Sequence, residues 1–220
     1  MKKLLLFAII TVSFLNASAQ TKDTLDVKID FYVGIGIQVQ NNLNINSKLA
    51  LAGLPTVPTT NPEFILGLSF FGKKYSGSIE GNGVYFRDNN GPNTTDLATA
   101  NIRSNFSYNL INKEKIAVTA GLNATFSFTQ FNIYNSNTVV DLNNLNPSSN
   151  TGLINLHNSM IYLGPSASLF LFKNTKWQVR LNAAYEFGVA RGSWKSNFAN
   201  VNNTVNERGN NRFVFGFVLL

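Results

Sequence analysis

The chain repeats a two-residue alternation of apolar and polar side chains in eight separate stretches. The most regular stretch has Val, Ile or Phe at every odd position from Val27 to Val39, with polar or small residues between them. Because side chains of a β-strand point alternately to opposite faces, this period predicts strands whose two faces meet different surroundings. The other seven predicted strands are Phe64–Phe71, Tyr75–Phe86, Leu97–Leu110, Ile116–Phe128, Ile161–Phe172, Trp177–Val189 and Arg212–Leu220. The sequence therefore predicts an all-β fold.

Alternation of this kind fits two classes of barrel, which differ in where the apolar face points. A secreted soluble β-barrel that binds a hydrophobic ligand turns this face inward, whereas a transmembrane barrel turns it outward to lipid. The polar face of the predicted strands consists mainly of Ser, Thr, Asn and Gly, and only 13% of all residues are charged. A water-exposed sheet usually carries many Lys and Glu. The low charge therefore favours the transmembrane barrel, with the soluble barrel as an alternative.

Short and long connections alternate along the chain. The short, basic ones are residues 72–74, 111–115 and 173–176, and the long, Asn-rich ones are residues 41–62, 87–96, 130–159 and 191–206. Outer-membrane barrels have short periplasmic turns and long outward loops. The pattern predicts an eight-stranded antiparallel up-and-down transmembrane β-barrel with both ends of the chain on the periplasmic side.

Aromatic residues lie near the predicted strand ends, where a membrane barrel carries its interfacial girdles. The expected girdle residues are Tyr75, Tyr108 and Trp177 by the short turns, and Tyr85, Phe128 and Phe187 by the long loops.

The start of the chain predicts a cleaved signal peptide. Met1–Lys3 is a short basic segment, and the apolar run Leu4–Leu15 is too short to span a bilayer as a helix. Ala17 and Ala19 supply the small residues of an Ala-x-Ala site, so we expect cleavage after Ala19. This divides the chain into a signal peptide, residues 1–19, and an outer-membrane β-barrel, residues 20–220.

Together these features resemble the small eight-stranded outer-membrane β-barrel proteins of the OmpA and OmpX type. The resemblance covers the whole mature chain and includes its apolar last strand, Phe213 to Leu220. It implies a Gram-negative outer-membrane location and recognition of that strand by the barrel-insertion machinery. The family usually ends this strand with Phe, whereas this chain ends with Leu220. Such barrels host several different functions, so the resemblance implies the architecture rather than one activity.

Charged residues on the polar face of the strands are candidates for an ion-pair network in the lumen. An eight-stranded barrel is only wide enough for side chains to fill its interior, and an unpaired buried charge costs several kcal/mol. The candidates are Lys28, Asp30, Glu80, Arg103, Arg180, Glu186 and Arg212. A gated narrow pore is the alternative use of the same residues, but the small lumen favours negligible conductance.

The chain offers little for catalysis, since it has no Cys and one His. This excludes a thiol nucleophile and a multi-histidine metal site, and we expect no cofactor. His157 and Ser159 are the remaining catalytic candidates, because their spacing is similar to that of the lipid A deacylases, which are lipid-modifying barrel enzymes. A base beside a hydroxyl could attack a membrane lipid. No acid follows Ser159 before Glu186, and Asp141 would have to fold back, so we expect no enzyme.

Five residues of the predicted long loops are candidates for contact with a surface protein or glycan. They are Phe131, Tyr134, Arg191, Trp194 and Lys195. Exposed aromatic side chains among polar neighbours suit recognition, and loops on a rigid scaffold often carry binding. Hydrophilic spacers that keep the surface solvated are the alternative. Loss of the signal peptide lowers the formal charge from +7 to about +5, and no stripe of Lys and Arg points to a nucleic-acid partner.

Overall fold

A computed structural model of the chain describes residues 27–135, 137, 152–175, 177–202 and 205–220. The predicted signal peptide, residues 1–19, and Asp141 lie outside the described residues. In the described part, no helix has both the length and the apolar character needed to cross a membrane.

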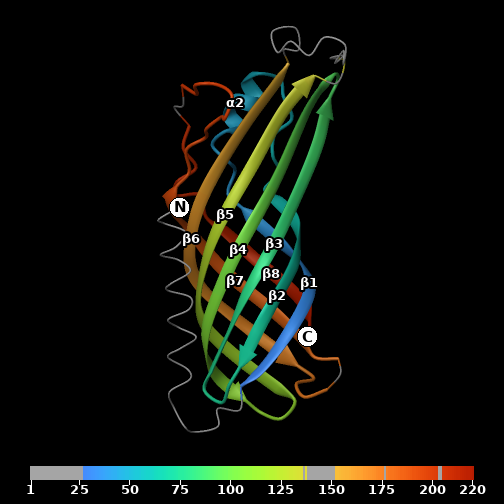
Figure 1. The fold of residues 1–220 in the computed structure, drawn as a ribbon, viewed down its shortest axis with the longest axis vertical. Helices are drawn as coiled ribbons and strands as arrows, with labels where there is room; N and C mark the ends of the chain where they lie inside the picture. Colours follow the sequence, from blue (N-terminus) through green and yellow to red (C-terminus); the bar gives the residue numbers. More distant parts are fainter. Residues whose placement is uncertain (1–26, 136, 138–151, 176, 203–204) are drawn as a thin grey trace.

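Eight antiparallel strands form a closed barrel, in which each strand pairs with its neighbours in the chain and the last pairs with the first (Figure 1). The strands are β1 (Lys28–Gln40), β2 (Thr60–Phe71), β3 (Tyr75–Asn90), β4 (Asn93–Asn112), β5 (Ile116–Asn135), β6 (Leu153–Leu171), β7 (Val179–Arg191) and β8 (Arg212–Leu219). The predicted eight-stranded up-and-down architecture is therefore confirmed. The start of β1 and the end of β8 lie at the same end of the barrel as the short turns, which we call the periplasmic end.

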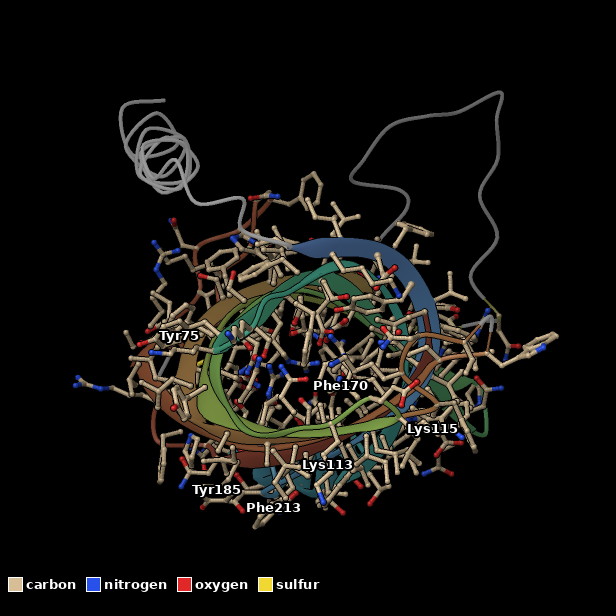
Figure 2. The ribbon with its side chains drawn as sticks, turned by 90° about the horizontal axis from the view of Figure 1, so that it is seen from below. Tyr75, Lys113, Lys115, Phe170, Tyr185 and Phe213 are labelled. Carbon is tan, nitrogen blue, oxygen red and sulfur yellow. The ribbon has the colours of Figure 1, made fainter. Side chains whose placement is uncertain are left out.

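The apolar face of each strand points away from the barrel axis. On β1, Ile29 is 70% exposed on the outside, whereas Tyr32 on the inside is 1% exposed. Viewed from the periplasmic end, Phe170 lies within the ring, and Tyr75 and Phe213 lie on its outside (Figure 2). A water-soluble barrel needs the opposite arrangement. The outer surface is thus matched to lipid, and the inner surface to polar side chains.

The strands β3 to β6 continue beyond the rest of the barrel at its other end, which we call the outward end (Figure 1). The expectation of a long loop at residues 87–96 is wrong, because β3 and β4 run on to Asn90 and Asn93 and meet in a turn at Gly91, where φ is +59°. The predicted loop at residues 130–159 is shorter for the same reason, since β5 and β6 extend into it at both ends. The ends of β3 and β4 are rich in Asn and Thr and pair there through polar residues such as Asn90 and Asn93, so the hydrophobic alternation stops before these two strands do.

Candidate functional site

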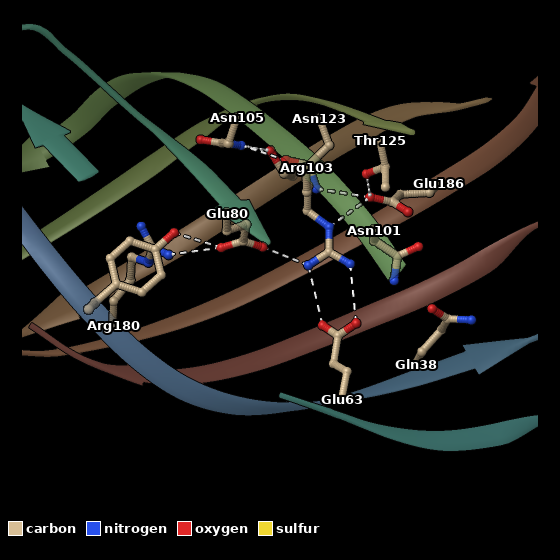
Figure 3. A network of polar contacts seen from close by, with 12 residues as sticks. Gln38, Glu63, Glu80, Asn101, Arg103, Asn105, Asn123, Thr125, Arg180 and Glu186 are labelled. Atoms are coloured by element: carbon tan, nitrogen blue, oxygen red, sulfur yellow. Dashed lines mark hydrogen bonds and ion pairs between the residues drawn. The ribbon is translucent and has the colours of Figure 1, made fainter. Parts of the chain in front are cut away.

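The centre of the lumen is organised around Arg103 of β4. Its guanidinium contacts three carboxylates: Nη1 lies 2.6 Å from Glu80 and 3.2 Å from Glu63, and Nε lies 3.1 Å from Glu186 (Figure 3). These glutamates come from β3, β2 and β7, so one side chain joins four strands. All four side chains are at most 5% exposed.

Two further arginines complete the charge balance. Arg180 lies 3.3 Å from Glu80, and Arg212 lies 2.6 Å from Glu186. Each guanidinium also covers a tyrosine ring, at 4.2 Å from the Tyr32 centroid and 3.9 Å from the Tyr162 centroid. Three cations thus face three anions in this central network, as burial requires, because a buried charge is stable only when it is paired and hydrogen-bonded.

Neutral donors add a further hydrogen bond to two of the carboxylates, at oxygens that also contact an arginine. The Tyr32 hydroxyl donates to Glu80 at 2.7 Å, and the Thr125 hydroxyl donates to Glu186 at 2.7 Å. Arg212 also donates to Gln38 at 2.9 Å. The central network is therefore held by polar side chains from most of the barrel wall.

Five of the seven charges expected in the lumen meet in this network: Glu80, Arg103, Arg180, Glu186 and Arg212. Lys28 and Asp30 form a separate ion pair of 3.0 Å near the periplasmic end, where Lys28 also donates to Gln178.

Sequence reasoning missed Glu63. It stands between the predicted loop at residues 41–62 and the predicted strand from Phe64, and Pro62 hides the start of β2. Glu63 is two residues before Ile65 and alternates in phase with the inward positions of β2. Extending the two-residue period back by one residue from Phe64 is the signal that finds it, and the preceding proline does not exclude this, since a proline is tolerated near the end of a strand.

Side chains fill the lumen on both sides of the central network. Towards the periplasmic end, Phe71 and Phe170 pack edge to face with ring centroids 5.0 Å apart, against Ala117. Two cavities border the network, with volumes of about 20 and 30 Å³. Each has room for one or two water molecules and no more.

At the outward end, the inward faces of the strands become apolar and are covered by loop residues. We call this cluster the outward cap. It includes the helix α2 (Asn46–Leu51) and consists of Ile45, Leu49, Val57, Leu97, Phe131, Ile133 and Trp194. The expectation that Phe131 and Trp194 are exposed for recognition is wrong: they are 0% and 4% exposed, and their rings pack against each other with centroids 5.7 Å apart. Burial of apolar area stabilises this packing, so Phe131 and Trp194 stabilise the outward cap instead of presenting a recognition surface.

Glu207 fastens the outward cap and was also missed. Its carboxylate accepts hydrogen bonds from the backbone N–H of Asn44 at 2.7 Å and of Ile45 at 3.0 Å, and from the Trp194 indole at 3.0 Å. The side chain lies inside the cap and is only 2% exposed. It precedes the last strand and belongs to no alternating pattern, so the sequence carries no signal for this role.

The other loop candidates lie at the surface. The Tyr134 hydroxyl accepts a hydrogen bond from Arg87, whose guanidinium lies 5.7 Å from the centroid of the Tyr134 ring. Arg191 and Lys195 are exposed. All six predicted girdle residues also lie on the outer surface, with exposed fractions between 43% and 76%: Tyr75, Tyr85, Tyr108, Phe128, Trp177 and Phe187.

His157 and Ser159 both face the outside of β6, but they do not form a catalytic pair in the described residues. His157 stacks on Phe128 with centroids 6.1 Å apart, and its buried Nδ1 has no hydrogen-bond partner in the described part of the chain. Ser159 Oγ contacts Arg191 Nη1 at 3.4 Å. A base of this kind needs a group that orients its second nitrogen. The described residues also contain no cluster of three or more His, Asp or Glu side chains that could hold a metal ion.

Comparison with known proteins gives distant likenesses in fold only. No protein-family model matches the chain, and no curated protein matches its sequence. Among solved structures, the chain is similar to Ail, the attachment invasion locus protein of Yersinia pestis, with 8% identity, a TM-score of 0.46, and coverage of 87% of this chain and 95% of that one.

Two other solved structures are similar at the same distant level. Neisserial surface protein A matches with 12% identity and a TM-score of 0.43, covering 87% of this chain and 98% of that one. The outer membrane protease OmpT of Escherichia coli matches with 10% identity and a TM-score of 0.33, covering 91% and 97%. The closed ring and its apolar outer face identify the chain independently, as an eight-stranded transmembrane β-barrel of the outer-membrane type.

Proposed function

We propose that the protein is an integral outer-membrane β-barrel with a non-enzymatic role in envelope structure or in contacts at the cell surface. The observation that carries this proposal is the filled interior. The central network occupies the middle of the lumen and the outward cap occupies its outward end. Among the residues that the structure describes, the projecting strands and the loops around the cap remain for contact with a partner at the cell surface, and a surface protein or glycan fits their polar character.

The same proposal assigns roles to the two ends of the chain. Residues 1–19 act as a signal peptide, and the strand from Phe213 to Leu220 is recognised by the insertion machinery. Its outward residues Phe213, Phe215, Phe217 and Leu219 form the apolar face that such a strand presents to lipid.

The mature protein is expected to fractionate with outer membranes and to resist carbonate extraction. Because the closed barrel is held by an unbroken ring of hydrogen bonds, an unboiled sample should migrate differently on a denaturing gel from a boiled one. Release from the membrane as a monomer without detergent would refute the transmembrane assignment.

Purified protein inserted in planar bilayers is expected to show no stable open channel. The cavities of about 20 and 30 Å³ are too small for a continuous water column, and Arg103 lies across the lumen with all three of its carboxylate partners. The measurement is single-channel current in symmetric salt, with a large porin as the positive control. A reproducible open level of large conductance would show that the central network opens as a gate.

A further inference from the structure

The apolar outer band ends at the same level on three neighbouring strands. On β5 its last outward residue is Phe128, which pairs with Ser159 of β6, where the outward side chains become polar. On β7 the band runs through Phe187 and Val189 and ends at Arg191, which pairs with Met160 of β6. This common boundary is where lipid tails give way to headgroups.

Arg191 is turned onto the outer surface at this boundary. Its φ of +67° is rare for a residue with a side chain and is the kind of local strain that occurs at functional positions. The guanidinium lies 5.5 Å from the centroid of the outward Phe126 ring and donates to Ser159 Oγ at 3.4 Å. Ser159 is neutral, so the charge of Arg191 has no ionic partner in the described residues.

Lys195 lies beside it on the same surface. Its backbone pairs directly with His157, through hydrogen bonds of 2.7 and 2.9 Å in the two directions. Directly opposed residues of antiparallel segments share a face, and His157 stacks on Phe128 on the outside. His157 is two residues from Ser159, so the pairing sets the backbone of Lys195 roughly 7 Å along the strand direction from Ser159, the residue that the Arg191 guanidinium contacts.

No acidic side chain offsets these two cations on the described part of this rim. Residues 126–135, 153–160 and 187–202 contain no Asp or Glu. The nearest acids along the chain on either side, Glu186 and Glu207, both point inward. Glu186 is paired with arginines in the lumen, and Glu207 is bound in the outward cap by Trp194 and two backbone N–H groups. We call Arg191 and Lys195 the cationic rim.

We propose that the cationic rim binds the phosphate group of a phosphorylated glycolipid headgroup in the outer leaflet. A guanidinium matches two phosphate oxygens at once, and an ammonium adds a point charge that tolerates several geometries. Phe126 and Phe128 are exposed on the outer surface beside Arg191 and His157, where they would meet the lipid chains. A free anion would use the two charges alone, whereas a lipid uses the charges and the aromatic surface together.

The test measures lipid binding to the mature protein in detergent micelles by native mass spectrometry. The probe is lipid A with both phosphates, compared with the same lipid after their removal and with inorganic phosphate. The double variant Arg191→Gln/Lys195→Gln is expected to bind phosphorylated lipid A about tenfold more weakly than the unaltered protein, since each basic residue near a lipid surface contributes measurably. Dephosphorylated lipid should bind both proteins equally weakly.

The matched control is Lys48→Gln/Arg87→Gln, which removes the same charge from the outward end but away from the cationic rim. It should bind lipid A as the unaltered protein does. Equal loss in both double variants, or equal affinity for lipid with and without phosphate, would overturn the proposal. Inorganic phosphate binding as tightly as lipid A would overturn the lipid assignment. A change of gel mobility on boiling shows that each variant is folded. If the double variant does not fold, the single variant Lys195→Gln, which changes an exposed side chain, is compared with the unaltered protein for binding of phosphorylated lipid A.

Discussion

Replacing Arg103 with Met is expected to lower the free energy of unfolding by about 3–5 kcal/mol, the loss typical of breaking a buried ion pair. The change leaves three buried carboxylates facing two arginines. Glu80 retains Arg180 and Glu186 retains Arg212, but Arg103 is the only ionic partner of Glu63 in the described residues. Urea unfolding of the protein in micelles, followed by the unboiled gel band, measures the loss.

Two further variants distinguish the effect of leaving Glu63 without an ionic partner from a general loss of barrel stability. Adding Glu63→Gln to Arg103→Met removes the stranded charge and should recover a large part of the stability. Lys28→Met breaks an ion pair whose lysine is 48% exposed, and should cost less than about 1 kcal/mol. A loss in Lys28→Met equal to that in Arg103→Met would contradict the central position of Arg103.

Gly164→Ala is expected to destabilise the barrel by about 3 kcal/mol or more, or to prevent its closure between β6 and β7. A methyl group at this position would lie 1.8 Å from the carbonyl oxygen of Tyr185 and 3.0 Å from Cα of Glu186. These are backbone atoms of the neighbouring strand, which cannot move aside without shifting the carboxylate that holds Arg103 and Arg212. The fraction of protein in the unboiled folded band measures the effect.

The control for this change is Gly81→Ala on β3. A methyl group there meets no atom within 4 Å, so the folded fraction and the unfolding midpoint should stay unchanged. Unaltered stability in Gly164→Ala would show that β6 and β7 tolerate a wider separation than the structure has.

The strands that cross the apolar band could be predicted from the sequence because each must present one face to lipid. The predicted stretch at residues 27–39 differs from β1 by a single residue at each end. The outward ends of β3 to β6 were not found in this way. Pairs such as Asn90 with Asn93 are polar on both faces, and in β5 the outward side chains become polar while inward ones such as Phe131 and Ile133 become apolar, so the lipid-facing period is lost.

The same reasoning found most of the central network, since charges in phase with the inward positions must meet in a narrow lumen. It failed for the outward cap, where Glu207 contacts Asn44 across 163 positions of chain. It also placed Phe131 and Trp194 at the surface, because an aromatic residue among polar neighbours looks the same in sequence whether it faces solvent or a covering helix. Whether such a residue is exposed or buried depends on the path of the loops, which the sequence pattern does not show.

The long reach of Glu207 has a consequence for the order in which the molecule is assembled. Its partners Asn44 and Ile45 follow the first strand, whereas Glu207 itself arrives just before the last. The first loop is also held by hydrogen bonds that Asn90 donates to Gly53 and Thr95 donates to Pro55. Its start, at Asn44 and Ile45, gains the Glu207 contacts only when nearly the whole polypeptide has been delivered. Completion of the outward cap is therefore a late step of biogenesis, because it requires the segment before the last strand to reach the loop after the first strand.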